Sequence, residues 1–197
     1  MRTKICGITN LQDANDAINA GANALGFVFY PKSKRYIKPE TAASIVEQLP
    51  PFVQFVALFV NETPAHINSV CKEAKMDLAQ VISEDNSNEY FDALSVKYIK
   101  VIRAKSKADI TKYKDEYILV DAFVPEFGGE GKRVALEWFK DIDCSKIILA
   151  GGLTQTNLKE LKGLGFYGVD VSSGVEASRG KKDKIKIINF IKAADEI

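Results

Sequence analysis

Short apolar runs alternate along the chain with stretches in which apolar residues recur at helical spacing. Runs of roughly four to eight residues rich in Val, Ile, Leu and Phe are typical of buried strands. We expect strands at Thr3 to Cys6, Ala24 to Phe29, Phe52 to Phe59, Leu78 to Ile82, Tyr98 to Ile102, Tyr117 to Asp121, Lys146 to Ala150 and Gly168 to Val171. A helix candidate follows each strand, so the pattern predicts an α/β protein.

Several helix candidates carry the residues that begin or end a helix. Proline suits the first turn, and glycine suits the position just after the last turn. The helices expected on this ground are Leu11 to Ala20 ended by Gly21, Pro39 to Gln48, Thr154 to Lys162 ended by Gly163, and Asp183 to Ala194.

Eight strand-helix units fit a compact single (β/α)8 TIM barrel that spans residues 1–197 as one domain. The chain is shorter than the roughly 250 residues typical of that fold, so a doubly wound open sheet is the alternative. No G-x-G-x-x-G motif follows the first strand, where a dinucleotide-binding sheet would carry it. The barrel is therefore the favoured architecture.

Glycine-rich segments end the seventh and eighth predicted strands. In a TIM barrel these two loops commonly bind phosphate, since glycine lets backbone N–H groups approach an anion closely. Ordinary turn chemistry is the alternative for each segment taken alone, but their occurrence in adjacent units favours phosphate binding. The residues expected to bind the phosphate of a small-molecule substrate are Gly151, Gly152, Ser172, Ser173 and Gly174.

Charge and composition exclude several classes of partner. The 27 basic and 26 acidic residues leave a formal charge of +1, which gives no global attraction for nucleic acid or an anionic membrane. No apolar run is long enough to span a bilayer, and the first residues lack the apolar core of a signal peptide, so we expect a cytoplasmic protein. No specific interface is evident, and a monomer is preferred over a homodimer.

The chain holds three cysteines and one histidine. The odd number and the lack of a C-x-x-C spacing argue against a disulfide framework and against a metal site. Cys71 and Cys144 are expected to pack in the core, and His66 to lie on the surface. Cys6, in contrast, ends the first strand, and Asp121 ends the sixth, so we interpret these two as the base and the acid of one site.

Several segments, in order, resemble the phosphoribosylanthranilate isomerase family of tryptophan biosynthesis. The most specific are Lys4 to Thr9 (KICGIT) and Val169 to Glu176 (VDVSSGVE), and they are joined by Ala24 to Phe29, Ser33 to Arg35, Gly128 to Gly131, Leu149 to Leu153 and Gly180 to Asp183. The resemblance extends over the whole chain and implies the TIM-barrel fold.

The resemblance implies an Amadori rearrangement of N-(5-phosphoribosyl)anthranilate to 1-(2-carboxyphenylamino)-1-deoxyribulose 5-phosphate, with no cofactor and no metal. It matches Cys6 with the general base and Asp121 with the general acid. It also implies substrate binding by Arg35, Gln80, Gly129 and Asp170. Arg35 is expected to bind the anthranilate carboxylate or to lie against its ring. Asp170 is expected to hold ribose hydroxyls, or else to cap the short helix that follows it.

The proposed base and acid need pKa values shifted toward neutrality, because a free thiol titrates near 8.5 and a free aspartate near 3.9. Strand alternation places Lys4 on the same face as Cys6, so we expect Lys4 to lower the pKa of the thiol, with a structural ion pair as the alternative. Burial is expected to raise the pKa of Asp121. The apolar, glycine-containing segment from Ala122 to Lys132 is interpreted as a closing lid.

Two positions depart from the family pattern. Where relatives usually read Gln-Leu-His-Gly after the fourth strand, this chain has Ile82 in place of the histidine, and Glu130 stands where they have threonine. These departures bear on substrate affinity more than on reaction type. The alternatives are a sugar-phosphate-binding barrel without turnover, an isomerase for a related aminoaldose phosphate, and another phosphate-binding barrel such as indole-glycerol-phosphate synthase.

Overall fold

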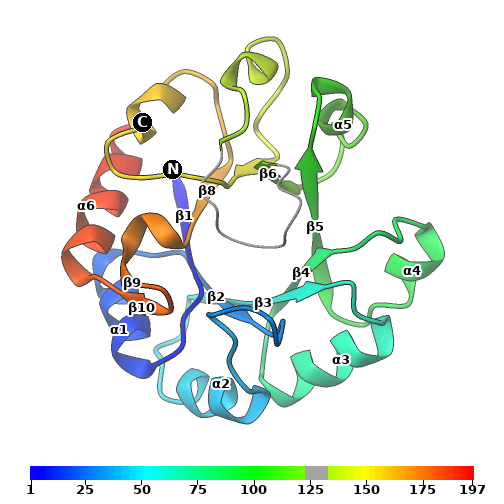
Figure 1. The fold of residues 1–197 in the computed structure, drawn as a ribbon, viewed down its shortest axis with the longest axis vertical. Helices are drawn as coiled ribbons and strands as arrows, with labels where there is room; N and C mark the ends of the chain where they lie inside the picture. The colour runs from blue at the N-terminus through cyan, green and yellow to red at the C-terminus, as the bar shows by residue number, and fades with distance from the viewer. Residues whose placement is uncertain (123–132) are drawn as a thin grey trace.

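Eight parallel strands close into a barrel in the order in which they occur along the chain, β1 to β8. The computed structural model describes residues 1–122 and 133–197. Looking along the barrel, the strands form an inner ring and the helices lie outside it (Figure 1). The pairing of β1 with β8, in which Lys4 is opposite Asp170, completes the ring. The predicted TIM barrel is confirmed, and the open-sheet alternative is wrong.

The elements have the following bounds: β1 Arg2–Cys6, α1 Leu11–Ala20, β2 Ala24–Val28, α2 Pro39–Val46, β3 Gln54–Val60, α3 Pro64–Glu73, β4 Leu78–Ile82, α4 Asn88–Asp92, β5 Lys97–Ala104, α5 Lys107–Thr111, β6 Ile118–Ala122, η1 Leu136–Phe139, β7 Ile147–Leu149, η2 Leu158–Leu161, β8 Gly168–Val171, η3 Ser173–Val175, β9 Glu176–Ser178, β10 Lys181–Lys182 and α6 Lys184–Asp195. All eight predicted strands are present, with ends that differ by at most two residues.

Two predictions about local structure are wrong. Phe52 was expected to begin the third strand, but it is fully exposed with a φ of 69° and belongs to the turn before β3. The α-helix expected from Thr154 to Lys162 is instead the short 3-10 segment η2. A 3-10 turn repeats every three residues, which places Leu158 and Leu161 on one side, where both are buried.

The core has two parts. A small cluster fills the inside of the barrel and consists of Val56, Leu78, Ile99, Leu119 and Ala150. The larger cluster packs between the strands and the helices and includes Phe27, Phe59, Phe139 and Phe190, each at most 1% exposed. Because side chains alternate across each strand, every second residue points into the barrel and those near the carboxyl ends face its mouth.

The segment between β8 and α6 positions part of the site. There the chain forms η3 and then a two-stranded hairpin of β9 and β10 before α6 begins. The Asp183 side chain accepts a hydrogen bond from the Lys186 N–H at the start of α6. The hairpin lies beside the mouth of the barrel next to α1 (Figure 1). It brings Glu176 and Lys182 toward residues near the beginning of the chain.

Candidate active site

One pocket opens at the carboxyl ends of the strands. Catalytic residues of TIM barrels gather at this end. Ten of the residues predicted for the site line it, namely Cys6, Arg35, Gln80, Asp121, Gly151, Gly152, Asp170, Ser172, Ser173 and Gly174. The eleventh, Gly129, lies outside the described residues, as do Glu130 and all of the predicted lid, Ala122 to Lys132, except Ala122.

A buried ion pair lies beside the candidate base. Lys4 Nζ is 2.8 Å from Asp170 Oδ1, and both residues are buried. A Cβ atom at Gly26 would lie 2.8 Å from Cys6 Sγ and 2.9 Å from Lys4 Nζ, so the thiol and the ammonium pack over the same glycine. Asp170 therefore faces Lys4, and the alternative that it caps the following helix is wrong, since η3 has no side-chain cap hydrogen bond.

The electrostatic environment of Cys6 contains opposing effects. Burial raises the pKa of the thiol above its ordinary value, and Lys4 and Lys182 act in the opposite direction. The expected effect of Lys4 thus has the predicted sign, but the prediction that the site lowers the thiol pKa is wrong for the site without substrate. The physical reason is that burial raises the free energy of the thiolate by more than the two ammonium groups lower it.

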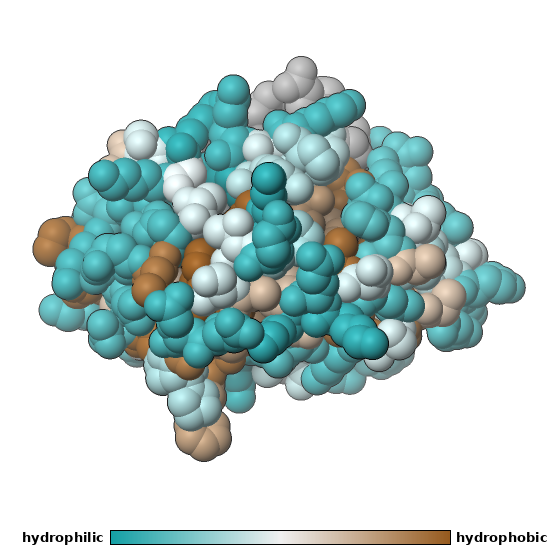
Figure 2. Space-filling model, turned by 90° about the horizontal axis from the view of Figure 1, so that it is seen from below, coloured by the Kyte–Doolittle hydropathy of each residue, from teal (hydrophilic) through white to brown (hydrophobic). Residues whose placement is uncertain are grey.

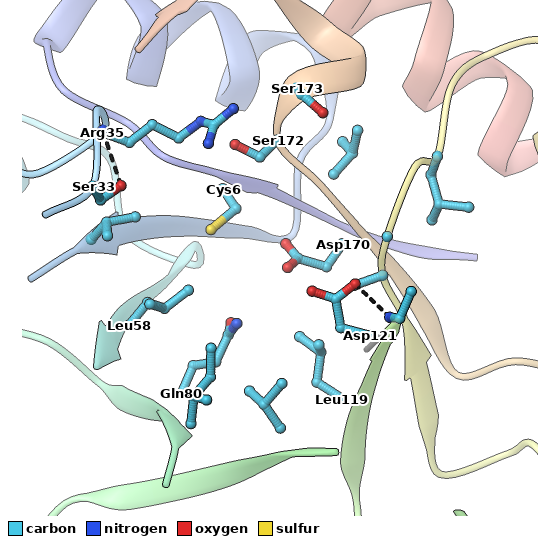
Figure 3. A pocket seen from close by; sticks show the side chains of 18 of the residues that line it. Cys6, Ser33, Arg35, Leu58, Gln80, Leu119, Asp121, Asp170, Ser172 and Ser173 are labelled. Atoms are coloured by element: carbon cyan, nitrogen blue, oxygen red, sulfur yellow. Dashed lines mark hydrogen bonds between the residues drawn. The ribbon is translucent and has the colours of Figure 1, made fainter. Parts of the chain in front are cut away.

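Asp121 is the last residue but one of β6 and has its carboxyl in the pocket. Its Oδ1 accepts a hydrogen bond of 2.8 Å from the Ala122 N–H. Burial raises the pKa of Asp121 to about 6 and Asp170 adds to the rise, whereas the hydrogen bond from the Ala122 N–H and, less strongly, Arg103 oppose it. The expected direction of this shift is confirmed. Figure 3 shows the Cys6 sulfur and the Asp121 carboxyl on different sides of the pocket, with Asp170 between them.

The predicted phosphate-binding residues come together at the ends of β7 and β8. Gly151 and Gly152 have φ values of 86° and 61°, in the left-handed region that glycine adopts without strain. Gly174 lies so close to the preceding loop that a Cβ atom would stand 2.0 Å from the Leu153 carbonyl oxygen. The hydroxyl-bearing Ser172 and Ser173 line the pocket beside them (Figure 3).

Arg35 is held by a partner that the sequence did not reveal. Its Nε donates to Glu176 Oε1 at 2.7 Å and its Nη2 donates to Glu176 Oε2 at 2.8 Å, a bidentate pair. Burial raises the pKa of Glu176, but Arg35 and Lys182 outweigh this and hold the pKa below its ordinary value. The Arg35 guanidinium lies next to Ser172 (Figure 3).

Lys182 was also missed, although it belongs to the family-like segment near Gly180. Its ammonium donates to the Ser172 carbonyl at 3.2 Å, to the Ser172 hydroxyl oxygen at 3.3 Å and to Glu176 Oε1 at 3.1 Å. An ammonium has three N–H donors, so these contacts use all of them. Because the Ser172 oxygen accepts from Lys182, its own proton is directed away from the ammonium.

The opposite side of the pocket is more apolar. Ile82, from β4, lines it together with Leu58, Val101 and the basic Arg103. Gln80 is 3% exposed, and its Oε1 accepts no hydrogen bond from any of the residues that the structure describes. An amide oxygen buried in this way is suited to accept a hydrogen bond from a bound molecule.

The predictions that Cys71 and Cys144 pack in the core and that His66 lies on the surface are confirmed. Cys71 and Cys144 are buried, and His66 is exposed.

Within residues 1–122 and 133–197, no group of three or more His, Cys, Asp or Glu side chains is arranged to hold a metal ion. In the same residues, no helix is both long and apolar enough to cross a bilayer.

Comparisons with known proteins agree with this geometry. Residues 3–193 match the family model described as N-(5'phosphoribosyl)anthranilate (PRA) isomerase. N-(5'-phosphoribosyl)anthranilate isomerase of a Nitratiruptor species is 59% identical over 194 residues, which cover 98% of each chain.

Solved structures give the same result. A phosphoribosyl anthranilate isomerase in complex with reduced 1-(o-carboxyphenylamino)-1-deoxyribulose 5-phosphate superposes with a TM-score of 0.84 at 38% identity over the full length of both chains. Mutually generated monomers of the dimeric enzyme from Thermotoga maritima give a TM-score of 0.86 at 36% identity, also over the full length of both. The chain therefore belongs to the phosphoribosylanthranilate isomerase family, whose members are enzymes of tryptophan biosynthesis.

Proposed function

We propose that this isomerase converts N-(5'-phosphoribosyl)anthranilate with Cys6 as general base and Asp121 as general acid. The observation that carries the assignment is that a thiol and a carboxyl with a pKa near 6 line one pocket with the phosphate-type loops of β7 and β8. An acid with a pKa close to the working pH is efficient at donating a proton.

The phosphate is proposed to bind at Gly151, Gly152, Ser172, Ser173 and Gly174. Backbone N–H groups of the glycine-rich turns would contact its oxygens. The Ser172 hydroxyl, whose oxygen accepts from Lys182, is left with its proton available for donation. This placement sets the ribose over Cys6, Asp121 and Asp170.

In the first step, Asp121 protonates the ribose ring oxygen while the anthranilate nitrogen lone pair forms a double bond to C1. The bond between C1 and the ring oxygen breaks, and an open-chain iminium results. Asp121 is left as a carboxylate. Protonation is required because an ether oxygen leaves poorly as an alkoxide.

In the second step, the Cys6 thiolate removes the proton from C2, and the electron pair moves into the C1–C2 bond to give an enolamine. The iminium charge makes this proton more acidic. Lys4 and Lys182 both favour the thiolate, which the buried site otherwise disfavours. The Cys6 thiol then gives a proton to C1, and the C2 hydroxyl gives its proton to the Asp121 carboxylate, which yields the aminoketose. No atom is gained or lost, and both groups regain their starting protonation.

Three other residues are proposed to position the substrate. Gln80 offers its buried amide oxygen to a ribose hydroxyl. Asp170, whose Oδ1 binds Lys4, is proposed to hold ribose hydroxyls. Arg35 uses two of its five N–H donors on Glu176 and is proposed to lie against the substrate beside Ser172.

The test follows the loss of fluorescence when freshly made phosphoribosylanthranilate is added to the protein and to the variants Cys6→Ala and Asp121→Asn. Each variant is expected to lose about 10²- to 10⁴-fold in kcat. Cys71→Ala and Asp92→Asn serve as controls, since Cys71 lies in α3 and Asp92 ends α4, away from the pocket. A wild-type protein that binds the reduced product without turnover would instead support the binding-protein alternative.

The oligomeric state and the cellular location of this chain are also proposed from its sequence. The relative from Thermotoga maritima is described as dimeric, whereas the sequence of this chain led us to prefer a monomer. The face of the molecule in Figure 2 is mostly hydrophilic, with apolar side chains in scattered groups. We keep the monomer as our proposal, which sedimentation equilibrium would test, and a cytoplasmic location stays a prediction.

A further inference from the structure

The pocket has two chemically different halves. The ends of β7 and β8 supply glycines and hydroxyls, whereas β3 to β5 supply Leu58, Val60, Ile82 and Val101. In a closed ring of eight strands taken in order, β3 and β4 lie across from β7 and β8. A substrate with its phosphate at the polar half therefore extends its aromatic ring toward the apolar half.

The aromatic ring of the proposed substrate carries a carboxylate, which is costly to bury without a cation. Among the described residues that line the pocket, Arg35 and Arg103 are the basic ones. Arg35 is bound by Glu176 on the side of β8, next to Ser172 (Figure 3). It is therefore placed near the phosphate end rather than the aromatic end.

Arg103 lies in the apolar half. It is near the end of β5, two residues after Val101 and therefore on the same face of the strand, and it is in register with Asp121 of β6. We propose that Arg103 binds the anthranilate carboxylate and thereby determines specificity for a carboxylated aromatic amine. This inference rests on the proposed function.

The neighbouring position supports the assignment. Ile82 ends β4, the strand that pairs with β5, and it stands where the family resemblance leads one to expect a histidine. The isoleucine side chain offers no hydrogen-bond donor. A guanidinium on the adjacent strand offers several, in a planar array that matches a carboxylate. Ile82, Val101 and Arg103 also form the wall toward a second groove beside α5.

The position of Arg103 beside Asp121 has a consequence for the acid. In the site without substrate, Arg103 opposes the rise in the pKa of Asp121. A substrate carboxylate bound to Arg103 would offset this cation, so that Asp121 holds its proton more firmly in the complex. Binding of the substrate carboxylate to Arg103 and protonation of Asp121 would then be linked.

The test compares two ligands: reduced 1-(o-carboxyphenylamino)-1-deoxyribulose 5-phosphate and the analogue that lacks the carboxylate. Affinities are measured by calorimetry for wild type, Arg103→Met, Arg103→Lys and Lys97→Met. Lys97 begins the same strand with the same side-chain direction but does not line the pocket, so it controls for loss of one charge. Thermal melting shows that each variant is folded.

Arg103→Met is expected to weaken the carboxylated ligand about 10- to 100-fold and the analogue less than about 3-fold, and Lys97→Met to change neither. The affinity of Arg103→Lys for the carboxylated ligand should lie between those of wild type and Arg103→Met. This variant replaces Arg103→Met in the comparison if the methionine variant does not fold. Equal weakening of both ligands would overturn the proposal, as would unchanged affinity for the carboxylated one, which would point to Arg35. Wild-type turnover is measured in parallel, because its absence would refute the proposed function rather than the role of Arg103.

Discussion

Lys4 and Asp170 form an ion pair of 2.8 Å in which each side chain is only 8% exposed, although they are 166 residues apart in the sequence. The pair lies beside the Cys6 thiol, which both partners influence in opposite directions. A buried pair of this kind is costly to break from one side, because the remaining charge loses its partner. The stability of the barrel and the protonation of the proposed base, Cys6, therefore both depend on this pair.

The first prediction concerns this pair. Lys4→Met should raise the pKa of Cys6, because Lys4 favours the thiolate, and Asp170→Asn should lower it, because Asp170 disfavours the thiolate. The pH dependence of alkylation by iodoacetamide gives the midpoint for each variant. Lys4→Met should also destabilise the fold by about 3–5 kcal/mol, since it leaves a buried carboxylate without its cation.

Arg2→Met is the control for these two variants, since Arg2 lies two residues before Lys4 on the same face of β1 and does not line the pocket. Its Cys6 midpoint should match that of wild type. Midpoints that move in the same direction in Lys4→Met and Asp170→Asn would contradict the electrostatic explanation.

The second prediction uses the pKa of Asp121, which is about 6 in the fold and near 3.9 in an unfolded chain. A raised pKa means that the folded state favours the protonated carboxyl. This contribution to stability is present below pH 4 and is lost as the pH rises through 6. Asp121→Asn, which cannot ionise, should therefore unfold at higher urea concentration than wild type at pH 8, by up to about 3 kcal/mol.

At pH 4 the same variant should differ little from wild type in urea, while its activity is lost at every pH. The asparagine amide oxygen can still accept the hydrogen bond from the Ala122 N–H, so the local geometry is retained. A variant that is less stable than wild type at pH 8 would show that the ionised carboxylate is stabilised by contacts that outweigh its burial.

The third prediction concerns Lys182, which contacts Ser172 but does not itself line the pocket. Lys182→Met should leave Ser172 without its donor and weaken inhibition by inorganic phosphate by about 10-fold, a typical loss for one hydrogen bond to a charged group. The pH at which kcat falls with the ionisation of Asp121 should not move.

Lys181→Met is the matched control, because Lys181 is the adjacent residue of β10 and is exposed. Phosphate should inhibit this variant as it inhibits wild type. If Lys182→Met kept wild-type phosphate affinity, Ser172 would not depend on the ammonium for its orientation.

The fourth prediction distinguishes the three thiols. Burial raises the pKa of Cys71 to about 12 and that of Cys144 to about 11, and neither lines the pocket. Cys6 is the thiol that faces the pocket, so alkylation of the native protein at pH 9 should modify Cys6 first. Peptide mass spectrometry identifies the site, and the reduced product should protect Cys6 alone. Modification of Cys71 or Cys144 before Cys6 would contradict this order.

The fold could be predicted from the sequence because each strand carries its own local signal. Apolar runs such as Leu78–Ile82 and Gly168–Val171 have the observed bounds, and the late glycines place a phosphate-type site at the end where it is found. The clearest failures lie at Phe52 and at Thr154 to Lys162. There the apolar pattern predicts a strand residue and an α-helix, whereas the folded chain has a turn at Phe52 and the 3-10 segment η2.

The contacts within the site could be predicted from the sequence only in part. The position of Lys4 on the face of Cys6 follows from strand alternation, and so does a possible ion pair. The pairing of Arg35 with Glu176 does not, since it joins the loop after β2 to the first residue of β9, which is 141 residues away, and depends on the path of the hairpin after β8. The net rise in the Cys6 pKa was mispredicted because the cost of burial is a property of the packed structure.

The distance along the chain between these partners also bears on how the protein is made. During synthesis Cys6 emerges first, but Asp170, Glu176 and Lys182 emerge only near the end. Until β8 pairs with β1, the thiol lacks the surroundings that bury it and the charges that tune it. Closure of the ring is a contact of very long sequence separation, which is entropically costly and slow to form. The proposed base therefore reaches its final environment only when the barrel closes. In a nascent chain without β8, the Cys6 thiol is not yet buried and lacks the neighbouring charges of Asp170 and Lys182.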